Sequence, residues 1–314
     1  MNRPLIAITG ATGFIGGRLA RALVDAGYDV RALTRRAPSR DVPSEVAWVQ
    51  GTLNNDEALN ALVKDAAFVV HCAGAIKARN RDEFLEVNAG GTRRLAAVAA
   101  AQSKPPRFIH LSSIAARAPT LSSYAASKRA SEQALRGFDI LRPVILRPPA
   151  VYGPGDMETL RIFQMAVKGF VVAPAQRTAR LSLVHVEDVT RAVLAALKLA
   201  EPPARPVEFD DGRIGGYTWP EIVTAAGEAL RTTPRLIRLP APLVYGVGLA
   251  GSVHAAMTGR PNVLCWDKVA ELLFPDWVAA GEPLFGYNPL WNIEKGFKDT
   301  VTWYASRGLL KSNG

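Results

Sequence analysis

The chain has 314 residues, of which 48% are hydrophobic and 21% are charged. The hydrophobic content excludes a disordered chain, and the length suits a large α/β unit that carries a smaller lobe. The formal net charge of +10 raises the question of an anionic partner. Because the basic residues are dispersed along the sequence, we expect no nucleic-acid binding.

Cysteine and histidine usage argues against a metal site and a disulfide framework. Cys72 and Cys265 are far apart, and the four histidines have no ligand spacing. We assign no chemistry to His71 or His110 and expect a structural role for His185. No charged-then-apolar leader precedes residues 5–8, and no stretch approaches the roughly 18 apolar residues of a membrane span. The sequence therefore predicts a cytoplasmic protein.

Short β-branched runs alternate with alanine- and leucine-rich stretches over the first 150 residues, as in a parallel sheet covered by helices. Strands are predicted at residues 5–9, 29–33, 47–50, 68–72, 108–112 and 139–147. Helices are predicted between them, among others at 14–27 and 84–102. The fold class is therefore α/β, a Rossmann-type doubly wound parallel sheet with a smaller, mostly helical C-terminal substrate lobe.

Prolines at 148, 149 and 154 mark the predicted boundary between a dinucleotide-binding domain, residues 1–150, and a substrate-binding lobe, residues 151–314. Strands near 181–189 and 207–209 are expected to rejoin the first domain, and helices are expected at 219–231 and 293–307. Residues 240–257 are apolar and glycine-rich. They predict a packed helix or the lining of an apolar substrate site, and weak peripheral contact with a membrane remains an alternative.

A glycine-rich turn, TGATGFIG, follows the first predicted strand and precedes the first helix. This is the context in which such a motif binds a dinucleotide. Gly10 permits the tight turn, Gly13 lets backbone N–H groups approach the pyrophosphate, and Gly16 lets the helix pack closely on the strand. Further candidate cofactor-binding residues of this turn are Thr12, Phe14 and Ile15.

The end of the second strand lacks the acidic residue that would bond the ribose of NAD and repel a 2′-phosphate. Thr34, Arg35 and Arg36 instead offer a hydroxyl and two guanidinium groups, which suit phosphate. NADP(H) is therefore favoured over NAD(H). The alternative is that Arg35 and Arg36 are loop residues that contact only solvent. Other candidate cofactor-binding residues follow the third and fourth strands: Thr52, Leu53, Cys72, Ala73 and Gly74.

Tyr124 and Lys128 stand four residues apart in the segment YAASK, downstream of Ser112 and Ser113. On a helix, Tyr124 and Lys128 share one face, so the ammonium can favour the ionised phenol. A phenol with an ordinary pKa of about 10 can then serve as an acid or base near neutral pH. Together with the glycine turn, this pattern indicates a nicotinamide-dependent enzyme.

These motifs resemble the extended short-chain dehydrogenase/reductases, the NAD-dependent epimerase/dehydratase superfamily, along nearly the whole chain. The segments that carry the resemblance are TGATGFIG, HCAG at 71–74, VNAGGT at 87–92, LSS at 111–113, YAASK at 124–128, RP at 147–148, VYGP at 151–154 and VHVEDV at 184–189. The order of these segments is specific for the superfamily but not for the substrate.

The resemblance implies that Tyr124 is the general acid/base, and that Lys128 lowers its pKa and bonds the nicotinamide ribose. Ser113 would hold the substrate oxygen, with Ser112 as the less favoured substitute. Asn88 would support the cofactor side or a proton relay. Two residues would pass beside the nicotinamide, Pro148 and Val151.

The interval of eleven residues from Ser113 to Tyr124 is short for a sugar-nucleotide site. Residues 286–289 match the tail of the branch that resembles 3β-hydroxysteroid dehydrogenases and dihydroflavonol reductases. We expect hydride transfer between nicotinamide and a carbonyl or secondary alcohol of an apolar, steroid- or terpenoid-like substrate. An anionic substrate is an alternative, because the second lobe contains four arginines that could bind one: Arg177, Arg180, Arg235 and Arg238.

Two other functions remain open, a nucleotide-sugar epimerase or dehydratase and a non-catalytic dinucleotide-binding subunit of a larger assembly. For the oligomeric state we predict a homodimer, paired through the helices after Phe84 and around Tyr124.

Overall fold

The structure is a computed structural model that describes residues 3–36, 44–258, 266–280, 284 and 286–310. The chain divides into two compact units. The first comprises Met1–Arg147, Thr190–Glu208 and Glu282–Tyr287, and the second Pro148–Val189, Phe209–Gly281 and Asn288–Gly314.

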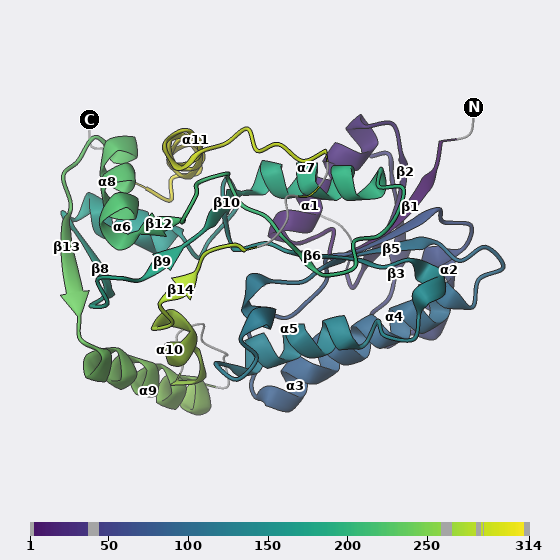
Figure 1. Ribbon diagram of the computed structural model, residues 1–314, viewed down its shortest axis with the longest axis horizontal. Coiled ribbons are helices and arrows are strands. Elements are labelled where there is room, and N and C mark those ends of the chain that lie inside the picture. The colour runs from purple at the N-terminus through teal and green to yellow at the C-terminus, as the bar shows by residue number, and fades with distance from the viewer. Residues whose placement is uncertain (1–2, 37–43, 259–265, 281–283, 285, 311–314) are drawn as a thin grey trace. The chain divides into compact units, whose positions relative to one another are not determined.

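A seven-stranded parallel sheet forms the first unit, in the order β11-β6-β5-β4-β1-β2-β3 (Figure 1). Its strands are β1 (Leu5–Thr9), β2 (Asp29–Thr34), β3 (Val46–Gln50), β4 (Phe68–His71), β5 (Arg107–Leu111), β6 (Val144–Arg147) and β11 (Val207–Glu208). Successive strands extend to both sides of β1 and β4, as in a doubly wound sheet. The predicted α/β fold is confirmed.

Helices cover both faces of this sheet (Figure 1). One face carries α1 (Phe14–Asp25) and α7 (Val186–Leu197), whereas α2 (Asp56–Val63), α4 (Gly91–Ala100) and α5 (Ser123–Gln133) lie on the other. On that second face, α2 and α4 bury leucines against Val69 and Phe108 of the sheet. Side-chain caps fix helix starts, since Asn55 accepts from the N–H of Ala58 and Ser122 from that of Ala125.

Two predicted elements of this unit differ from the structure. The strand expected at 139–147 begins only at Val144, after the short 3-10 helix η3 (Asp139–Leu141), because Pro143 has no N–H to give to a strand ladder. The helix expected at 84–102 is α3 (Arg81–Leu85), the π-helical turn η1 (Glu86–Gly90) and α4 in succession. Hydrophobic periodicity does not reveal the π turn, which widens the helix by one residue.

The described part of the second unit contains three small sheets. β7 (Ala150–Tyr152) pairs with β10 (Leu183–His185), β8 (Phe170–Pro174) with β13 (Arg235–Leu239), and β9 (Arg180–Leu181) lies between β12 (Tyr217–Thr218) and β14 (Asp276–Trp277). Of the segments expected to rejoin the first domain, only β11 lies in the seven-stranded sheet. β9 and β10 pair within the second unit, and residues 186–189 start α7, whose first turn carries Glu187 and Asp188.

Aromatic rings fill the core of the second unit. Phe297 on α11 (Ile293–Ser306) packs edge-on against Phe163 and Tyr152, at 5.0 and 5.1 Å between centroids. His185 is fully buried beside them and stacks on Trp291 at 4.2 Å. The remaining helices are α6 (Leu160–Val167), α8 (Trp219–Leu230), α9 (Ala241–Thr258) and α10 (Trp266–Leu272). None of the helices among the described residues has the length and hydropathy needed to cross a membrane.

Candidate active site

The strand order of the first sheet reverses between β1 and β4, and the loops that follow these two strands meet. Ligands of doubly wound folds bind at such a switch point, outside the carboxyl ends of the strands. Gly10 has a φ of +79°, and a Cβ built on it would lie 2.7 Å from the backbone N of Ala73. Only glycine satisfies both conditions, so the contact between the two loops explains the first glycine of the motif.

The glycine turn leads directly into α1. Its N-cap residue is Gly13, which has no side chain to accept from the first-turn N–H groups. Those donors and the positive end of the helix dipole suit a pyrophosphate. Thr12 and Gly13 are exposed, Phe14 and Ile15 are half-buried, and Gly16 is buried where a Cβ would collide with the carbonyl of Gly10. The turn therefore fits a dinucleotide.

The residues expected around the adenosine end lie at the ends of β2 and β3. Thr34 is buried, and its hydroxyl donates to the carbonyl of Arg36, whereas the side chains of Arg35 and Arg36 are exposed. Thr52 is exposed and accepts from the N–H of Asn54 at 3.2 Å. Leu53 packs onto α4, since a Cβ on Gly91 would lie 2.7 Å from its Cδ1.

A directed chain of hydrogen bonds runs through the buried His71, beneath these loops. Thr92 Oγ1 donates to the carbonyl of Asn88 at 2.6 Å, so it must accept from His71 Nε2, 2.9 Å away. His71 Nδ1 is then the acceptor for Thr9 Oγ1 at 2.6 Å, and Thr9 Oγ1 accepts from the N–H of Ala73 at 3.2 Å. The polar contacts alone thus fix the Nε2–H tautomer.

His71 stays neutral in this chain. Its burial, and then the charge of Lys128, lower its pKa to about 3. A neutral ring can donate at one nitrogen and accept at the other, which is what the two threonines require. His71 therefore joins the loop after β4 to the π turn, a positioning role that the sequence analysis did not assign.

Asn88 lies on the π turn and joins the same loop to α5. Its Oδ1 accepts from the N–H of Ala75 at 2.7 Å, and its Nδ2 donates to the carbonyl of Ala75 at 3.1 Å and to Ser127 Oγ at 2.8 Å. Ser127 Oγ donates in turn to the carbonyl of Tyr124 at 2.7 Å. The amide of Asn88 thus holds the loop after β4 against the helix that carries Tyr124.

Tyr124 and Lys128 both lie on α5, which packs against η1 and α3. Lys128 is buried, and its Nζ donates to the carbonyl of Leu111 at 2.9 Å. A Cβ built on Gly74 would lie 3.8 Å from this Nζ and 3.2 Å from Asn88 Oδ1. Tyr124 is half-buried and packs edge-on against Phe84, with 6.1 Å between the ring centroids. The structure therefore brings Gly74, Asn88 and Lys128 together.

Burial also shifts the two titratable groups beside Gly74. It lowers the pKa of Lys128 to about 8, an effect that the charge of Glu132 partly offsets. It raises the pKa of the Cys72 thiol to about 12, although the charge of Lys128 opposes this shift. Cys72 is therefore a neutral thiol near pH 7 and a poor nucleophile.

The two serines after β5 have different partners. Ser113 is the N-cap of the 3-10 helix η2 (Ile114–Arg117), is only half-buried, and accepts from the N–H of Ala115 at 3.2 Å. Ser112 is 5% exposed and donates to Glu132 Oε1 at 2.6 Å. Because the Ser112 hydroxyl is committed to a buried carboxylate, Ser113 is the better placed of the two to hold a substrate oxygen.

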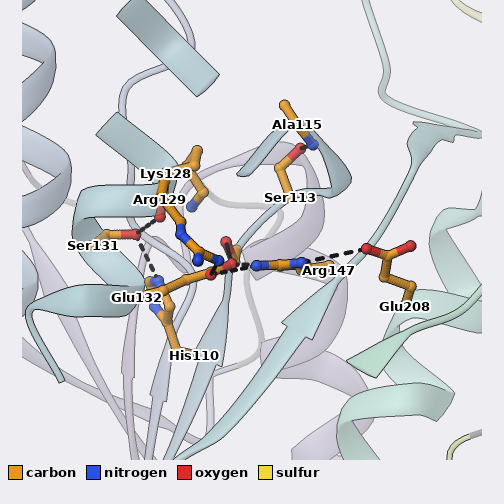
Figure 2. A network of polar contacts seen from close by, with 10 residues as sticks. His110, Ser113, Ala115, Lys128, Arg129, Ser131, Glu132, Arg147 and Glu208 are labelled. Atoms are coloured by element: carbon orange, nitrogen blue, oxygen red, sulfur yellow. Dashed lines mark hydrogen bonds and ion pairs between the residues drawn. The ribbon is translucent and has the colours of Figure 1, made fainter. Parts of the chain in front are cut away.

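Figure 2 shows the ion pairs that continue from Glu132. Arg147 donates to both carboxylate oxygens of Glu132, each at 2.7 Å, and its Nη1 lies 3.3 Å from Glu208 Oε1. Arg117 reaches the other oxygen of Glu208 at 3.2 Å. Burial alone would lower the pKa of Arg147, but its bonds to Glu132 and Glu208 raise it. These ion pairs, the Glu132–Arg147 network, join α5 to η2, β6 and β11.

The sequence analysis identified neither this network nor the roles of His71 and Thr92. Glu132 lies four residues after Lys128, so helical spacing places both on one face, but nothing in the sequence names Arg147 as its partner. Pro148 and Val151, expected beside the nicotinamide, belong to the second unit, where Val151 pairs with Val184. Among the described residues, no group of three or more His, Cys, Asp or Glu suits a metal ion.

Comparison with known proteins gives consistent results. The model of the NAD dependent epimerase/dehydratase family matches residues 6–208. A ceramide reductase of Caulobacter vibrioides is 43% identical over 99% of this chain and 98% of its own length. A 3 beta-hydroxysteroid dehydrogenase/Delta 5-->4-isomerase of Mycobacterium tuberculosis is 25% identical, over 96% of this chain and 90% of its own.

Solved structures share the fold at lower identity. The structure of MoeE5 in complex with UDP-glucuronic acid and NAD aligns with a TM-score of 0.73 at 21% identity. The alignment covers 98% of this chain and all of the other.

Proposed function

Because the chain belongs to the NAD-dependent epimerase/dehydratase family and is an NAD(P)-dependent oxidoreductase, we propose that it interconverts a ketone and a secondary alcohol on a ceramide-type lipid. The observation that carries this proposal is the 43% identity to a ceramide reductase over nearly the full length of both chains. A ceramide fits the expectation of an apolar substrate, but it is a chain lipid and not a steroid or terpenoid.

A simple ceramide has one secondary hydroxyl, on the carbon next to the one that bears the amide. In the direction of reduction, Tyr124 donates a proton to the ketone oxygen at that carbon, and Ser113 holds the same oxygen. Lys128 bonds the nicotinamide ribose, and its ammonium stabilises the phenolate that Tyr124 becomes. The bound nicotinamide supplies the hydride. Asn88 and His71 keep the loop after β4 in place, as their contacts with Ala75, Thr9 and Thr92 indicate.

Transfer of a labelled hydride tests the proposal. We expect the enzyme, given reduced nicotinamide dinucleotide with deuterium at C4 of the dihydronicotinamide ring and a ceramide oxidised to the ketone at its secondary alcohol, to place the deuterium on the carbinol carbon, as mass spectrometry would show. Conversion of a UDP-sugar to its epimer without net uptake of deuterium would favour the epimerase alternative. Tight cofactor binding without turnover of either substrate would favour the non-catalytic subunit.

For the cofactor we propose NADP(H), supported by the absence of an acid at the end of β2 and by the exposed side chains of Arg35 and Arg36. Charge-assisted hydrogen bonds are worth about 1.5–3 kcal/mol. Arg35→Ala with Arg36→Ala should therefore raise the KM for NADPH by about tenfold or more and leave the KM for NADH nearly unchanged. Equal effects on both cofactors would contradict the assignment.

We also propose that α9 contacts the surface of a lipid bilayer. This 18-residue helix contains no Asp, Glu, Lys or Arg. Large apolar side chains are 47–82% exposed along it, namely Leu243, Val247, Leu249, Val253 and Met257. The expectation of a packed helix does not account for this exposure. Trp266, 53% exposed at the start of the neighbouring α10, suits the interface between headgroups and acyl chains.

Sedimentation with vesicles tests this contact. The chain carries a net charge of +10, so binding should be stronger to phosphatidylcholine vesicles that contain phosphatidylglycerol than to phosphatidylcholine alone. Leu249→Glu with Val253→Glu should abolish the binding. Ile214→Glu is the matched control, because Ile214 is 97% exposed and lies outside α9. Binding that survives the double variant would contradict the proposal, as would self-association through α9 without lipid.

The predicted homodimer stays a proposal. Light scattering on the purified protein tests it, and a monomer mass at micromolar concentration would contradict it.

A further inference from the structure

A pocket of about 270 Å³ lies in the second unit, beside the three-stranded sheet β12-β9-β14. Helix α10 forms part of its wall and packs against α9. The apolar and aromatic side chains that line it are those of Leu181, Trp219, Leu272, Phe274 and Trp277, beside the charged Arg180, Lys268 and Glu271. None of them belongs to the site around Tyr124.

The polar groups of the lining residues have protein partners. Arg180 donates to the carbonyls of Gly215 and Gly216. Lys268 Nζ lies 2.8 Å from Glu271 Oε1, and Trp277 Nε1 donates to the carbonyl of Glu271 at 2.9 Å. With their heads engaged, Arg180 and Lys268 leave their aliphatic stems to the pocket. Such a wall favours hydrocarbon over a sugar or a phosphate.

The volume limits what the pocket can hold. Drug-sized ligands occupy pockets of about 300–1,000 Å³, so this one suits a part of a ligand. A flexible alkyl segment can adapt to a partly open space lined in this way, whereas a rigid fused ring system needs a matching shape.

We propose that this pocket binds the end of one alkyl chain of the lipid substrate. That the bound alkyl chain belongs to the substrate rests on the proposed function. The preference of the pocket for an alkyl chain does not. Its proximity to α9, the helix proposed to contact lipid, is consistent with a ligand that comes from a bilayer.

Quenching of tryptophan fluorescence measures this binding without turnover. The probes are N-(2-hydroxyethyl)alkanamides that carry a terminal bromine, from octanoyl to hexadecanoyl, because bromine quenches a nearby indole. At about 0.8 kcal/mol per methylene, the affinity should rise about fourfold with each added carbon until the pocket is full. The quenching should disappear when Trp219 and Trp277 are both replaced by Phe.

Two substitutions then locate the site. Leu272 is 39% exposed at the end of α10, so Leu272→Phe adds volume at the rim without disturbing the core. It should reduce the affinity for the longest probes by about tenfold or more and shorten the chain length at which affinity levels off. The matched control is Ile214→Phe, at a position that is 97% exposed and outside the pocket, which should leave the titration unchanged.

The outcomes separate the pocket from the proposed function. The pocket proposal would be contradicted if the affinity for the probes did not depend on their chain length, or if quenching persisted in the Trp219→Phe, Trp277→Phe variant. Either result would count even if the ceramide ketone is reduced. Chain-length-dependent quenching that Leu272→Phe weakens would support the pocket even if no lipid ketone is turned over.

Discussion

The carboxyl edge of the seven-stranded sheet and the α9–α10 region of the second unit differ in how many charged side chains they contain and in how these are buried. At the sheet edge, charges are buried and paired, since Glu132 and Arg147 are 5% and 8% exposed and share two hydrogen bonds of 2.7 Å. In the second region, α9 carries no acidic or basic side chain other than His254 and presents apolar groups outward.

Under the proposed function, this difference separates two tasks, hydride transfer and recognition of a lipid. Proton and hydride transfer need donors and acceptors held in fixed directions, which buried hydrogen-bond networks provide. Recognition of a hydrocarbon chain needs area and volume but few directional groups. Substitutions at the sheet edge should therefore change stability and chemistry, and substitutions around α10 should change affinity for long chains.

The largest stability effect should come from breaking the Glu132–Arg147 pair. Glu132→Gln leaves the buried guanidinium of Arg147 without its main countercharge, which typically costs about 3–5 kcal/mol. Urea unfolding measures this loss. The control is Glu201→Gln, which breaks the exposed pair with Arg142 at 2.8 Å, with Glu201 82% exposed, and should change the free energy of unfolding by less than about 1 kcal/mol.

A second variant sharpens this test. Replacing both partners, with Glu132→Met and Arg147→Leu, removes the uncompensated charge and should recover part of the lost stability. A double variant that is as unstable as the sum of the two single variants would show that the ion pair itself contributes little coupling.

Thr92→Val should have the next largest effect. The substitution keeps the shape of the side chain but leaves His71 Nε2 without its acceptor and the carbonyl of Asn88 without its donor. We expect a loss of about 1–3 kcal/mol in the free energy of unfolding, together with weaker cofactor binding. The control, Thr302→Val, removes the same kind of bond to a carbonyl four residues back on the exposed face of α11. Equal losses of stability in both variants would contradict a special role for the hydrogen bonds that run through His71.

The pH dependence of kcat/KM should be a smaller effect. Burial lowers the pKa of Lys128 to about 8, so its ammonium is lost as the pH rises through that value. kcat/KM should then fall by up to about tenfold per pH unit above 8. Stability should respond in the opposite direction. The unfolded chain holds this proton up to its ordinary pKa of about 10.4, so the Lys128 contribution to stability rises between about pH 8 and 10.4.

Measured profiles of kcat/KM and of the urea midpoint over pH 7 to 10 check these signs. A profile of kcat/KM that stays flat above pH 8 would show that the charge of Lys128 is not needed. Lys128→Arg keeps a charge at every pH, and the falling limb of any activity it retains should begin at a higher pH than in the wild type.

The sequence predicted the parts of the molecule that local patterns determine. The apolar runs predicted the strands of the first sheet other than β6 to within about one residue, and the glycine motif predicted the tight turn at Gly10. The strand expected at 139–147 failed in its first half, because its apolar residues also fit a 3-10 turn before Pro143. The π turn at Asn88 left no trace in the apolar periodicity.

The candidate site was predictable only where a residue acts within a motif. Tyr124, Lys128 and Ser113 belong to such motifs, but the partners that hold them come from other strands. Arg147 reaches Glu132 only after β6 has joined β5 in the sheet, and Glu208 arrives with β11. Long-range pairings of this kind depend on the sheet order, which the spacing of residues along the chain does not specify.

The most direct measurement is the turnover of the ceramide ketone by Tyr124→Phe compared with Tyr28→Phe. Both changes remove one phenolic oxygen, but Tyr28 lies just before β2, at the opposite end of the sheet, where its ring packs on Phe68. We predict that Tyr124→Phe lowers kcat by about 10²–10⁴-fold while the binding of cofactor and alkyl probes persists, and that Tyr28→Phe has wild-type activity. Undiminished turnover by Tyr124→Phe would contradict its assignment as the proton donor.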